Sequence, residues 1–290
     1  MTASDLVDSG ASIRVDDLPI SGGRHLRVEQ TGEPGQPALL FLHGSGPGVT
    51  AHSNWQAVIE GLGDRYHCIA PDILGFGESS FPEPAPQGFK AAAEVRIDAL
   101  LELVDSLGRE KVTLVGNSMG GMYSLRIAQL RPDLVERMVL MGSGGMPGLA
   151  PTPELIKLVT YFDDPTVEAM AELLLQFVHD KTAFGPKVEE IAAARMELVR
   201  RPEVEASHRG MFAPGEMLSF TPAELARLTM PTLVVHGRQD VIVPIECSYY
   251  LAEHLPKADL YVMNECGHWT QVEQARRFRA ILRHFVDGAS

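Results

Sequence analysis

The strongest chemical signal in the sequence is Gly-Asn-Ser-Met-Gly at positions 116–120. The apolar run KVTLV precedes it, and GMYSLRIAQL, a segment of helical pattern, follows it. This is G-x-S-x-G in the strand–turn–helix context that the motif requires. A turn this tight strains the backbone of Ser118 and needs small residues at Gly116 and Gly120. It exposes the Ser118 hydroxyl and aims the Met119 N–H at the same place, where it could stabilise an oxyanion.

A serine hydroxyl becomes a good nucleophile when a base takes its proton and an acid orients that base. Of the ten histidines, His268 lies in CGHWTQVEQ, between the last apolar run and the final helical pattern. Asp240 ends VVHGRQD, directly after another apolar run. Some proteins with this motif carry the acid one strand earlier, but there the chain reads MGSGGMPG and has no carboxylate until Glu154. The order Ser118, Asp240, His268 is that of the α/β-hydrolases, so we predict these three as the catalytic residues.

Glycines dominate the loop after the predicted strand Ala38–Leu42, which reads HGSGPGVTAHSNW. Gly44 and Gly46 let the backbone approach a ligand closely and turn an N–H inward. An oxyanion hole needs a second donor besides the Met119 N–H, and our candidate is the amide of Ser45. HGSGPG is a weak motif alone and becomes informative beside a nucleophile turn.

Short apolar runs alternate with longer segments of helical period along the chain. Runs such as ALLFL, VTLV and LVV are typical of strands buried on both faces of a sheet. In Ala91–Leu107 the apolar residues fall on one stripe, and Gly108 ends the predicted helix. This alternation predicts a mostly parallel central sheet flanked by helices. Together with the order Ser118, Asp240, His268, it leads us to expect an α/β-hydrolase fold. The predicted strands are Arg24–Gln30, Ala38–Leu42, Tyr66–Ala70, Lys111–Val115, Met138–Met141, Thr232–Val235 and Asp259–Met263.

The alternation stops after Met138–Met141, which corresponds to the sixth strand of that fold. The next apolar segments, such as Val167–Val178 and Val188–Val199, have helical patterns and are separated by Pro and Gly. An all-helical insertion at this point predicts a lid over the carboxyl edge of the sheet, where such sheets bind ligands. We therefore expect a core made of residues 1–145 and 217–290 and a lid, or cap, made of residues 146–216.

The composition is that of an ordinary soluble globular protein, with 290 residues of which 45% are hydrophobic. The net charge of −13, from 38 acidic and 25 basic residues, repels the phosphate backbone of nucleic acid. The basic cluster around Arg200 is too small for a groove binder, so we expect no nucleic-acid partner. No apolar run is long enough for a membrane-spanning helix, and we expect no membrane association.

Three cysteines, Cys68, Cys247 and Cys266, are too few and too scattered for a disulfide framework or a C-x-x-C metal clip. The N-terminal residues MTASDLVDSGASIR contain no apolar core and no basic residue before Arg14, so we expect no secretory signal. Free thiols without such a signal favour a cytoplasmic location. The histidines show no ligand spacing such as H-E-x-x-H, and we expect no metal and no organic cofactor.

Four motifs together resemble one family: HGSGPG followed by SNW, then GNSMGG, GRQD and CGHW. The sequence is similar to the meta-cleavage product hydrolases, which are α/β-hydrolases of aromatic hydrocarbon catabolism. They cut a carbon–carbon bond in 2-hydroxy-6-oxo-hexa-2,4-dienoates, the ring-opened products of catechol degradation. The resemblance covers the predicted core and implies that Asn54 and Asn117 contact the dienoate or its oxygens. It also implies that Trp269 lines the site and that the protein is a homo-oligomer, a dimer or higher.

In the predicted lid, ARMELVRRPE resembles the family segment whose arginine grips the substrate, and that arginine maps to Arg195. An acidic protein needs a local cation to hold a carboxylate, and a bidentate guanidinium suits one. Arg200, Arg201 and Arg209 compete for this role, and the alternative for Arg195 is a solvated helix face.

In the reaction that the resemblance implies, the enol ketonises with a proton added at C5 before the C6 carbonyl is attacked and the dienol leaves. His268 could move that proton, and Ser118 would attack or activate the carbonyl. The sequence leaves open whether Ser118 forms an acyl-enzyme or acts as a base for water, and which group the substrate carries at C6. A serine carboxylesterase or lipase-like hydrolase of small esters would use the same triad. A non-enzymatic ligand receptor on this fold is the alternative from another class.

Overall fold

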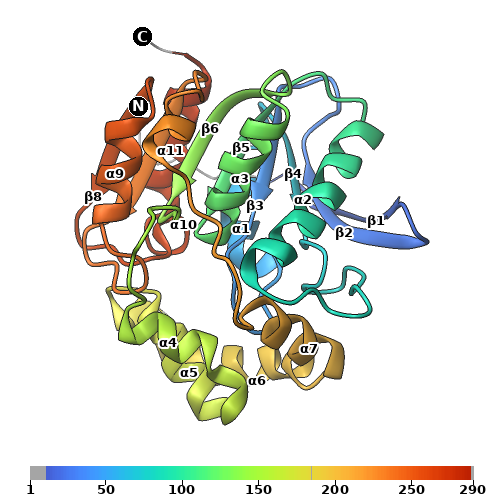
Figure 1. Cartoon of the computed structure of the whole chain (residues 1–290), viewed down its shortest axis with the longest axis vertical. Helices are drawn as coiled ribbons and strands as arrows, with labels where there is room; N and C mark the ends of the chain where they lie inside the picture. The colour runs from blue at the N-terminus through green and yellow to red at the C-terminus, as the bar shows by residue number, and fades with distance from the viewer. Residues whose placement is uncertain (1–10, 184, 289–290) are drawn as a thin grey trace, which may run out of the picture.

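The strands of the protein form a single sheet at its centre (Figure 1). The computed structural model describes residues 11–183 and 185–288, so the expectation about a secretory signal falls mostly outside the described residues. Within them the strand order is β1-β2-β4-β3-β5-β6-β7-β8. Strand β2 runs antiparallel to both of its neighbours, β1 and β4, and every other pair is parallel. The strands are β1 (Arg14–Ile20), β2 (Arg24–Thr31), β3 (Ala38–Leu42), β4 (His67–Pro71), β5 (Val112–Asn117), β6 (Val135–Met141), β7 (Thr232–Gly237) and β8 (Ala258–Met263).

Helices cover both faces of the sheet, because the strands send alternate side chains into two apolar cores. From β3, Leu40 and Leu42 share a core with α2, α3 and α9, and Leu39 and Phe41 share the opposite core with α1 and α11. The mostly parallel sheet flanked by helices that the sequence predicts is therefore confirmed. These helices are α1 (Ala51–Ile59), α2 (Phe89–Ser106), α3 (Met119–Leu130), α9 (Glu246–His254) and α11 (Ala275–Val286), with the short α8 (Pro222–Leu225) and α10 (Thr270–Glu273) beside them.

The structure differs from the sequence prediction at three elements. Strand β1 was not predicted, because its sequence RVDDLPI is mostly exposed and is held by antiparallel pairing with β2. The predicted C-terminal helix is divided at Gln274 into α10 and α11. The segment after β3, interpreted as a loop up to Trp55, is already helical from Ala51, where the Thr50 side chain caps α1 by accepting the Ser53 N–H.

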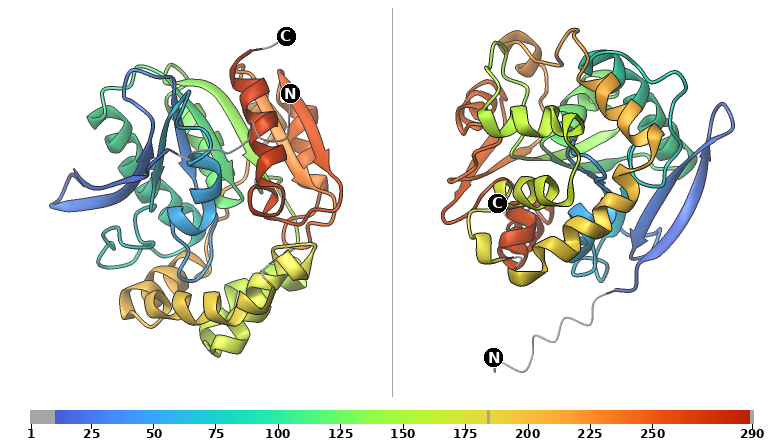
Figure 2. Two further views of the ribbon diagram at one scale, coloured as in Figure 1. Left: turned by 180° about the vertical axis from the view of Figure 1, so that it is seen from behind. Right: turned by 90° about the horizontal axis from the view of Figure 1, so that it is seen from below.

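The chain between β6 and β7 contains helices and turns, with no strand among its described residues. We call residues 146–216 the helical insertion; it forms a layer of its own against one end of the core (Figures 1 and 2). Its apolar core takes in Ile242, Val243 and Trp269, which follow strands β7 and β8. No helix in the described part of the chain combines the length and apolar character needed to cross a membrane. The insertion contains α4 (Pro153–Val159), α5 (Val167–Gln176), α6 (Val188–Val199) and α7 (Pro202–Met211), with 3-10 turns at Tyr161–Asp163, Lys181–Ala183 and Gly185–Lys187.

A buried histidine, His208 of α7, lies in the core of the insertion. Its ring packs against Phe162 and Phe212, with ring centroids 5.0 and 4.9 Å apart. Its Nε2–H donates to the Val159 carbonyl at 3.1 Å. Burial lowers the pKa of His208 to about 4, so the ring stays neutral at pH values where an exposed histidine would be protonated.

This pKa predicts that His208 makes the protein less stable in mild acid. Between the folded pKa of about 4 and the unfolded value near 6.5, the unfolded chain binds the proton more tightly, so stability falls as the pH falls. His208→Phe should remove this loss, which amounts to up to about 2 kcal/mol between pH 7 and pH 5. Urea unfolding of both proteins at the two pH values measures it. An equal decrease in both would contradict the prediction.

Candidate active site

Ser118 occupies the sharp turn between β5 and α3, with φ 54° and ψ −113°. Positive φ is uncommon for a residue other than glycine and is concentrated at functional sites. The turn fits only because its neighbours lack a side chain. A Cβ at Gly116 would lie 2.3 Å from the Gly120 carbonyl oxygen, and one at Gly120 would lie 2.1 Å from that of Leu42. Both positions of the motif therefore require glycine, because any side chain there would collide with the adjacent backbone.

His268 and Asp240 form a buried hydrogen-bonded pair on the loops after β8 and β7. His268 Nδ1 lies 2.7 Å from Asp240 Oδ2, and both side chains are 1% exposed. The other carboxylate oxygen, Oδ1, accepts the backbone N–H groups of Ile242 and Val243 at 2.8 and 3.0 Å. A carboxylate accepts and does not donate, so the imidazole carries its proton on Nδ1 and leaves Nε2 able to accept one.

Gly142, directly after β6, leaves the space in which this pair meets. A Cβ on Gly142 would lie 3.0 Å from His268 Nδ1 and 3.3 Å from Asp240 Oδ2. Its φ of 50° is also in the left-handed region that favours glycine. Sequence reasoning did not single out Gly142, although MGSGGMPG shows a glycine at the end of a strand.

A second histidine, His236 at the end of β7, supports the acid from behind and was also missed. Its Nε2–H donates to the Val243 carbonyl at 3.0 Å and lies 3.4 Å from Asp240 Oδ2. Its Nδ1 accepts the Ser248 hydroxyl at 2.7 Å. Burial lowers the pKa of His236, so this ring acts as a neutral support for the acid loop.

The glycine loop after β3 is held against Ser118 by His43. His43 Nδ1 donates to the Gly44 carbonyl at 2.8 Å, and Nε2 accepts the Ile73 N–H at 2.9 Å. Burial lowers the pKa of His43 to about 4, which keeps the ring neutral and both bonds intact near neutral pH. A Cβ on Gly44 would lie 3.3 Å from Ser118 Cβ, so only a glycine leaves this space open.

A small cavity brings together most of the residues predicted from the sequence. Asp240 lies behind His268, and Met119 begins α3 with its side chain buried in the core. Val49 and Phe177 also line the cavity and were missed, because their sequence pattern is that of ordinary core residues. The predicted residues that line it are Gly44, Ser45, Gly46, Asn54, Asn117, Ser118, Arg195, His268 and Trp269.

Two asparagines contact each other in this cavity. Asn54 Nδ2 donates to Asn117 Oδ1 at 3.4 Å, and Asn117 Nδ2 donates to the Met141 carbonyl at 3.3 Å. Asn54 Oδ1 is buried and accepts no hydrogen bond from the described residues. A buried acceptor of this kind is costly until a donor pairs with it, so it is suited to a ligand hydroxyl.

Arg195 of α6 brings a cation into the same cavity. Its Nε donates to the Pro47 carbonyl at 2.8 Å, and no carboxylate in the described part of the chain pairs with its guanidinium. Burial lowers the pKa of Arg195 to about 10, so the side chain is still charged at neutral pH. A partly buried cation without an anionic partner carries a desolvation cost, which favours binding of an anion in the cavity.

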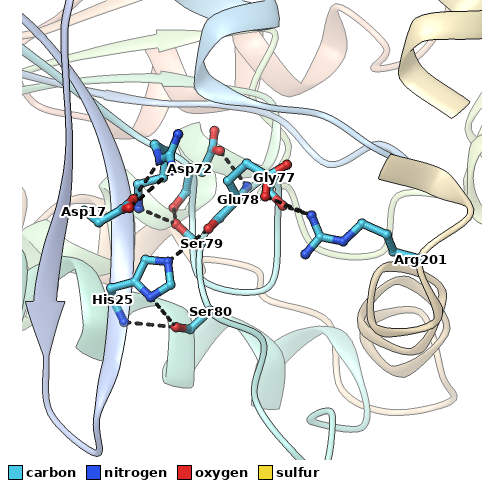
Figure 3. Close-up of polar contacts among 9 residues, drawn as sticks. Asp17, His25, Asp72, Gly77, Glu78, Ser79, Ser80 and Arg201 are labelled. Atoms are coloured by element: carbon cyan, nitrogen blue, oxygen red, sulfur yellow. Dashed lines mark hydrogen bonds and ion pairs between the residues drawn. The ribbon is translucent and has the colours of Figure 1, made fainter. Parts of the chain in front are cut away.

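None of the three competing arginines lines the cavity. Arg201 donates to Glu78 at 3.0 Å and to Glu203 at 2.9 Å, and Figure 3 shows it reaching the loop that holds Glu78. Arg209 forms ion pairs with two acidic residues of the insertion, and Arg200 is exposed. Arg195 is therefore the one of these four arginines that lines the cavity.

Known proteins are similar to this chain in both sequence and structure. The profile of the alpha/beta hydrolase family matches residues 39–281. The 2-hydroxymuconate semialdehyde hydrolase of Pseudomonas sp. (strain CF600) is 38% identical over 253 residues, which is 86% of each chain. The solved structure of 2-hydroxy-6-oxo-6-phenylhexa-2,4-dienoate hydrolase from Rhodococcus sp. strain RHA1 matches with a TM-score of 0.91 and 38% identity, over 96% of this chain and 100% of that one. The chain belongs to the meta-cleavage product hydrolases.

A meta-cleavage product hydrolase is an enzyme of the α/β-hydrolase fold that acts on carbon–carbon bonds, so the predicted fold and enzyme class are confirmed. Further relatives agree with this class. The 2-hydroxy-6-oxo-2,4-heptadienoate hydrolase of Pseudomonas putida is 32% identical over 283 residues, which cover 96% of this chain and 98% of the relative.

If Asp240 orients His268, Asp240→Asn should lower kcat of this hydrolase by up to about 10⁴-fold, because the amide permits the wrong imidazole tautomer. Ser118→Ala should lower kcat by at least about 10³-fold, because it removes the nucleophile. The variant should still fold, since alanine fits the same turn. Both variants are assayed by the loss of dienoate absorbance after circular dichroism has verified folding.

Glu154→Gln is the matched control, because Glu154 is the first carboxylate after β6 and should be dispensable. An inactive Glu154→Gln beside a fully active Asp240→Asn would show that Asp240 is the wrong acid.

Proposed function

We propose that this hydrolase cleaves the C5–C6 bond of a small-molecule 2-hydroxy-6-oxo-hexa-2,4-dienoate formed by opening of an aromatic ring. The observation that carries the proposal is that the unpaired cation of Arg195 shares one cavity with Ser118 and His268. The names of the relatives describe substrates that differ at C6, whereas the 2-hydroxy-6-oxo-dienoate part is common to them. That common part is what we propose the cavity recognises.

The polar end of the substrate would bind at Arg195 and the asparagines. A guanidinium donates two parallel hydrogen bonds to a carboxylate, which is the geometry needed for the C1 carboxylate. The buried Asn54 Oδ1 would accept the C2 hydroxyl, with Asn117 behind it. This arrangement would place the C6 carbonyl near Ser118, because the dienoate is a stiff conjugated chain of fixed length. We further propose that the helical insertion (residues 146–216) is the lid of a core made of residues 1–145 and 217–290, carrying Arg195 and Phe177 over the site.

We propose that the reaction begins with ketonisation: the C2 hydroxyl loses its proton, C5 gains one, and His268 moves the proton between them. Ser118 Oγ then adds to the C6 carbonyl while its own proton passes to His268 Nε2. The N–H groups of Ser45 and Met119 would stabilise the oxyanion. The C5–C6 bond breaks, and its electron pair moves through C3=C4 to the C2 ketone, which becomes an enol on protonation. Water then releases the acyl group from Ser118 as a carboxylic acid.

The serine carboxylesterase alternative shares Ser118, Asp240 and His268, so the triad does not distinguish it. Arg195 does, because a small neutral ester gains nothing from a cation in the cavity. Membership of an enzyme family speaks against the receptor alternative, which predicts binding without turnover. Hydrolysis of a dienoate in a simple assay would exclude it.

We also propose that the enzyme works in the cytoplasm as a homo-oligomer. The described cysteines Cys68, Cys247 and Cys266 are buried free thiols, which suits a reducing compartment. One edge of the sheet, at β8, lacks a neighbouring strand within the described residues and is available for contact with a second copy. Light scattering that returned the mass of a single 31.6 kDa chain would refute the oligomer.

Arg195→Gln tests the proposed function. Losing a charge-assisted contact should lower kcat/KM for a dienoate roughly ten- to a hundred-fold. Hydrolysis of p-nitrophenyl acetate, which has no carboxylate to bind, should hardly change. The measurement is the ratio of the two kcat/KM values, in which general damage to Ser118 and His268 cancels.

Arg200→Gln is the matched control, since it removes the same charge from the exposed end of the same helix and should leave the ratio unchanged. If Arg195→Gln lowers both activities equally, the residue is structural. If it lowers neither, the anion is bound elsewhere.

A further inference from the structure

The backbone of the insertion and the His268 loop approach each other unusually closely at Gly267. A Cβ on Gly267 would lie 2.8 Å from both the His179 nitrogen and the Phe177 carbonyl oxygen. Contact this tight with backbone, rather than with a flexible side chain, excludes every residue larger than glycine. The segment 177–180 of the insertion is therefore seated directly against the residue that precedes His268.

Glu273 of α10 bonds both of these segments at once. Its Oε1 accepts the N–H groups of His179 and Asp180 at 2.9 and 3.0 Å. Its Oε2 accepts the Gly267 N–H at 2.6 Å. One carboxylate thus satisfies three backbone donors, two from the insertion and one from the His268 loop. Hydrogen bonds to a charged acceptor are about twice as strong as neutral ones.

Phe177 adds an apolar contact beside this carboxylate. Its carbonyl accepts the Trp269 N–H at 3.0 Å, and its ring stacks on Trp269 with centroids 4.4 Å apart and an interplanar angle of 14°. The ring also lies 5.6 Å from the imidazole of His268. A shift of segment 177–180 would therefore move the ring of Phe177, which both lines the cavity and contacts His268.

The same segment leads to Arg195. Phe177 is the C-terminal cap of α5, and α5 packs along α6, the helix that carries Arg195. Glu273 itself lines a crevice on the surface, with His179, Asp180 and Lys181, whereas Arg195 lines the cavity. The two residues line different pockets, so a structural effect of Glu273 on Arg195 would be carried by the intervening backbone and helices.

We propose that Glu273 is a positioning residue that fastens the helical insertion to the His268 loop, so that Arg195 and His268 meet the substrate as one unit. This inference rests on the proposed function, in which Arg195 holds the carboxylate end of the dienoate. It assigns no chemical step to Glu273. Its carboxylate sets where the insertion sits relative to the base.

A double-mutant cycle tests the coupling, because spatial continuity alone does not demonstrate it. The variants are Glu273→Gln, Arg195→Gln and the double variant, and the quantity is the ratio of kcat/KM for a dienoate to that for p-nitrophenyl acetate. Glutamine keeps the size of the side chain but turns an NH2 toward a backbone N–H. Arg195→Gln should lower the ratio strongly in the wild-type background and only a few-fold in the Glu273→Gln background, a non-additivity of roughly ten-fold. Additive losses would overturn the proposal.

Glu265→Gln is the matched control, because Glu265 is an exposed carboxylate that lines the same crevice. It removes the same charge and should leave the ratio and its response to Arg195→Gln unchanged. An effect equal to that of Glu273→Gln would show that surface charge, not the three hydrogen bonds, is responsible, and would overturn the proposal.

Backbone hydrogen exchange gives a readout that does not depend on Arg195. Exchange in peptides covering residues 177–181 and 265–268 should accelerate together in Glu273→Gln and stay unchanged in Glu265→Gln. Acceleration in one segment alone would refute the fastening.

If Arg195→Gln alone leaves the activity ratio unchanged, the proposed function fails at Arg195, and the exchange result still decides for or against the fastening. Glu273→Asp, which keeps the charge on a shorter side chain, replaces Glu273→Gln in every arm if the latter does not fold.

Discussion

Backbone-on-backbone contact at the carboxyl edge of the sheet is the constraint on which the site depends. The ends of β3, β5, β6 and β7 converge there, and hydrogen bonding along the sheet fixes their spacing. Three of these contacts require a glycine: Gly116 against the Gly120 backbone, Gly120 against the end of β3, and Gly237, where a Cβ would lie 2.0 Å from the Gly267 carbonyl oxygen. Because backbone cannot adjust as a side chain can, the reacting groups are held in place by the same contacts that close the fold.

A second constraint is electrostatic. The chain carries a net charge of −13, yet the cation of Arg195 lines the cavity, and burial keeps two histidines of the supporting loops neutral. His43 and His236 accept no proton near neutral pH, so they add no positive charge that would compete with Arg195 for an anion. The desolvation of Arg195 is a cost in the free enzyme. A carboxylate substrate offsets that cost on binding, which favours occupancy by anions over neutral molecules of the same shape.

The parts of the molecule that sequence reasoning predicted are those whose determinants lie within a few consecutive residues. Runs such as ALLFL are apolar throughout because β3 is buried on both faces, and G-x-S-x-G records a local steric requirement. Strand β1 was not predicted from the sequence, because its pairing with β2, and not its own residue pattern, makes it a strand. His236 was read only as part of VVHGRQD, since its hydrogen bonds to Val243 and Ser248 depend on how two loops fold back. The hydrogen bonds of Glu273 could not be predicted from the sequence either, because its partners are backbone N–H groups, which every residue except proline has.

The close seating of Gly267 against the insertion has a consequence for recombination between relatives. Exchanging residues 146–216 for the corresponding segment of another hydrolase is an obvious way to transfer a substrate preference. The junctions at β6 and β7 are not the only places where such a chimaera must match. The incoming segment must also present a backbone that follows the path of residues 177–180, because the two segments are so close that a Cβ on residue 267 would lie 2.8 Å from that backbone. Compatibility of a transplanted insertion therefore also depends on a third point, far from both ends of the graft in sequence.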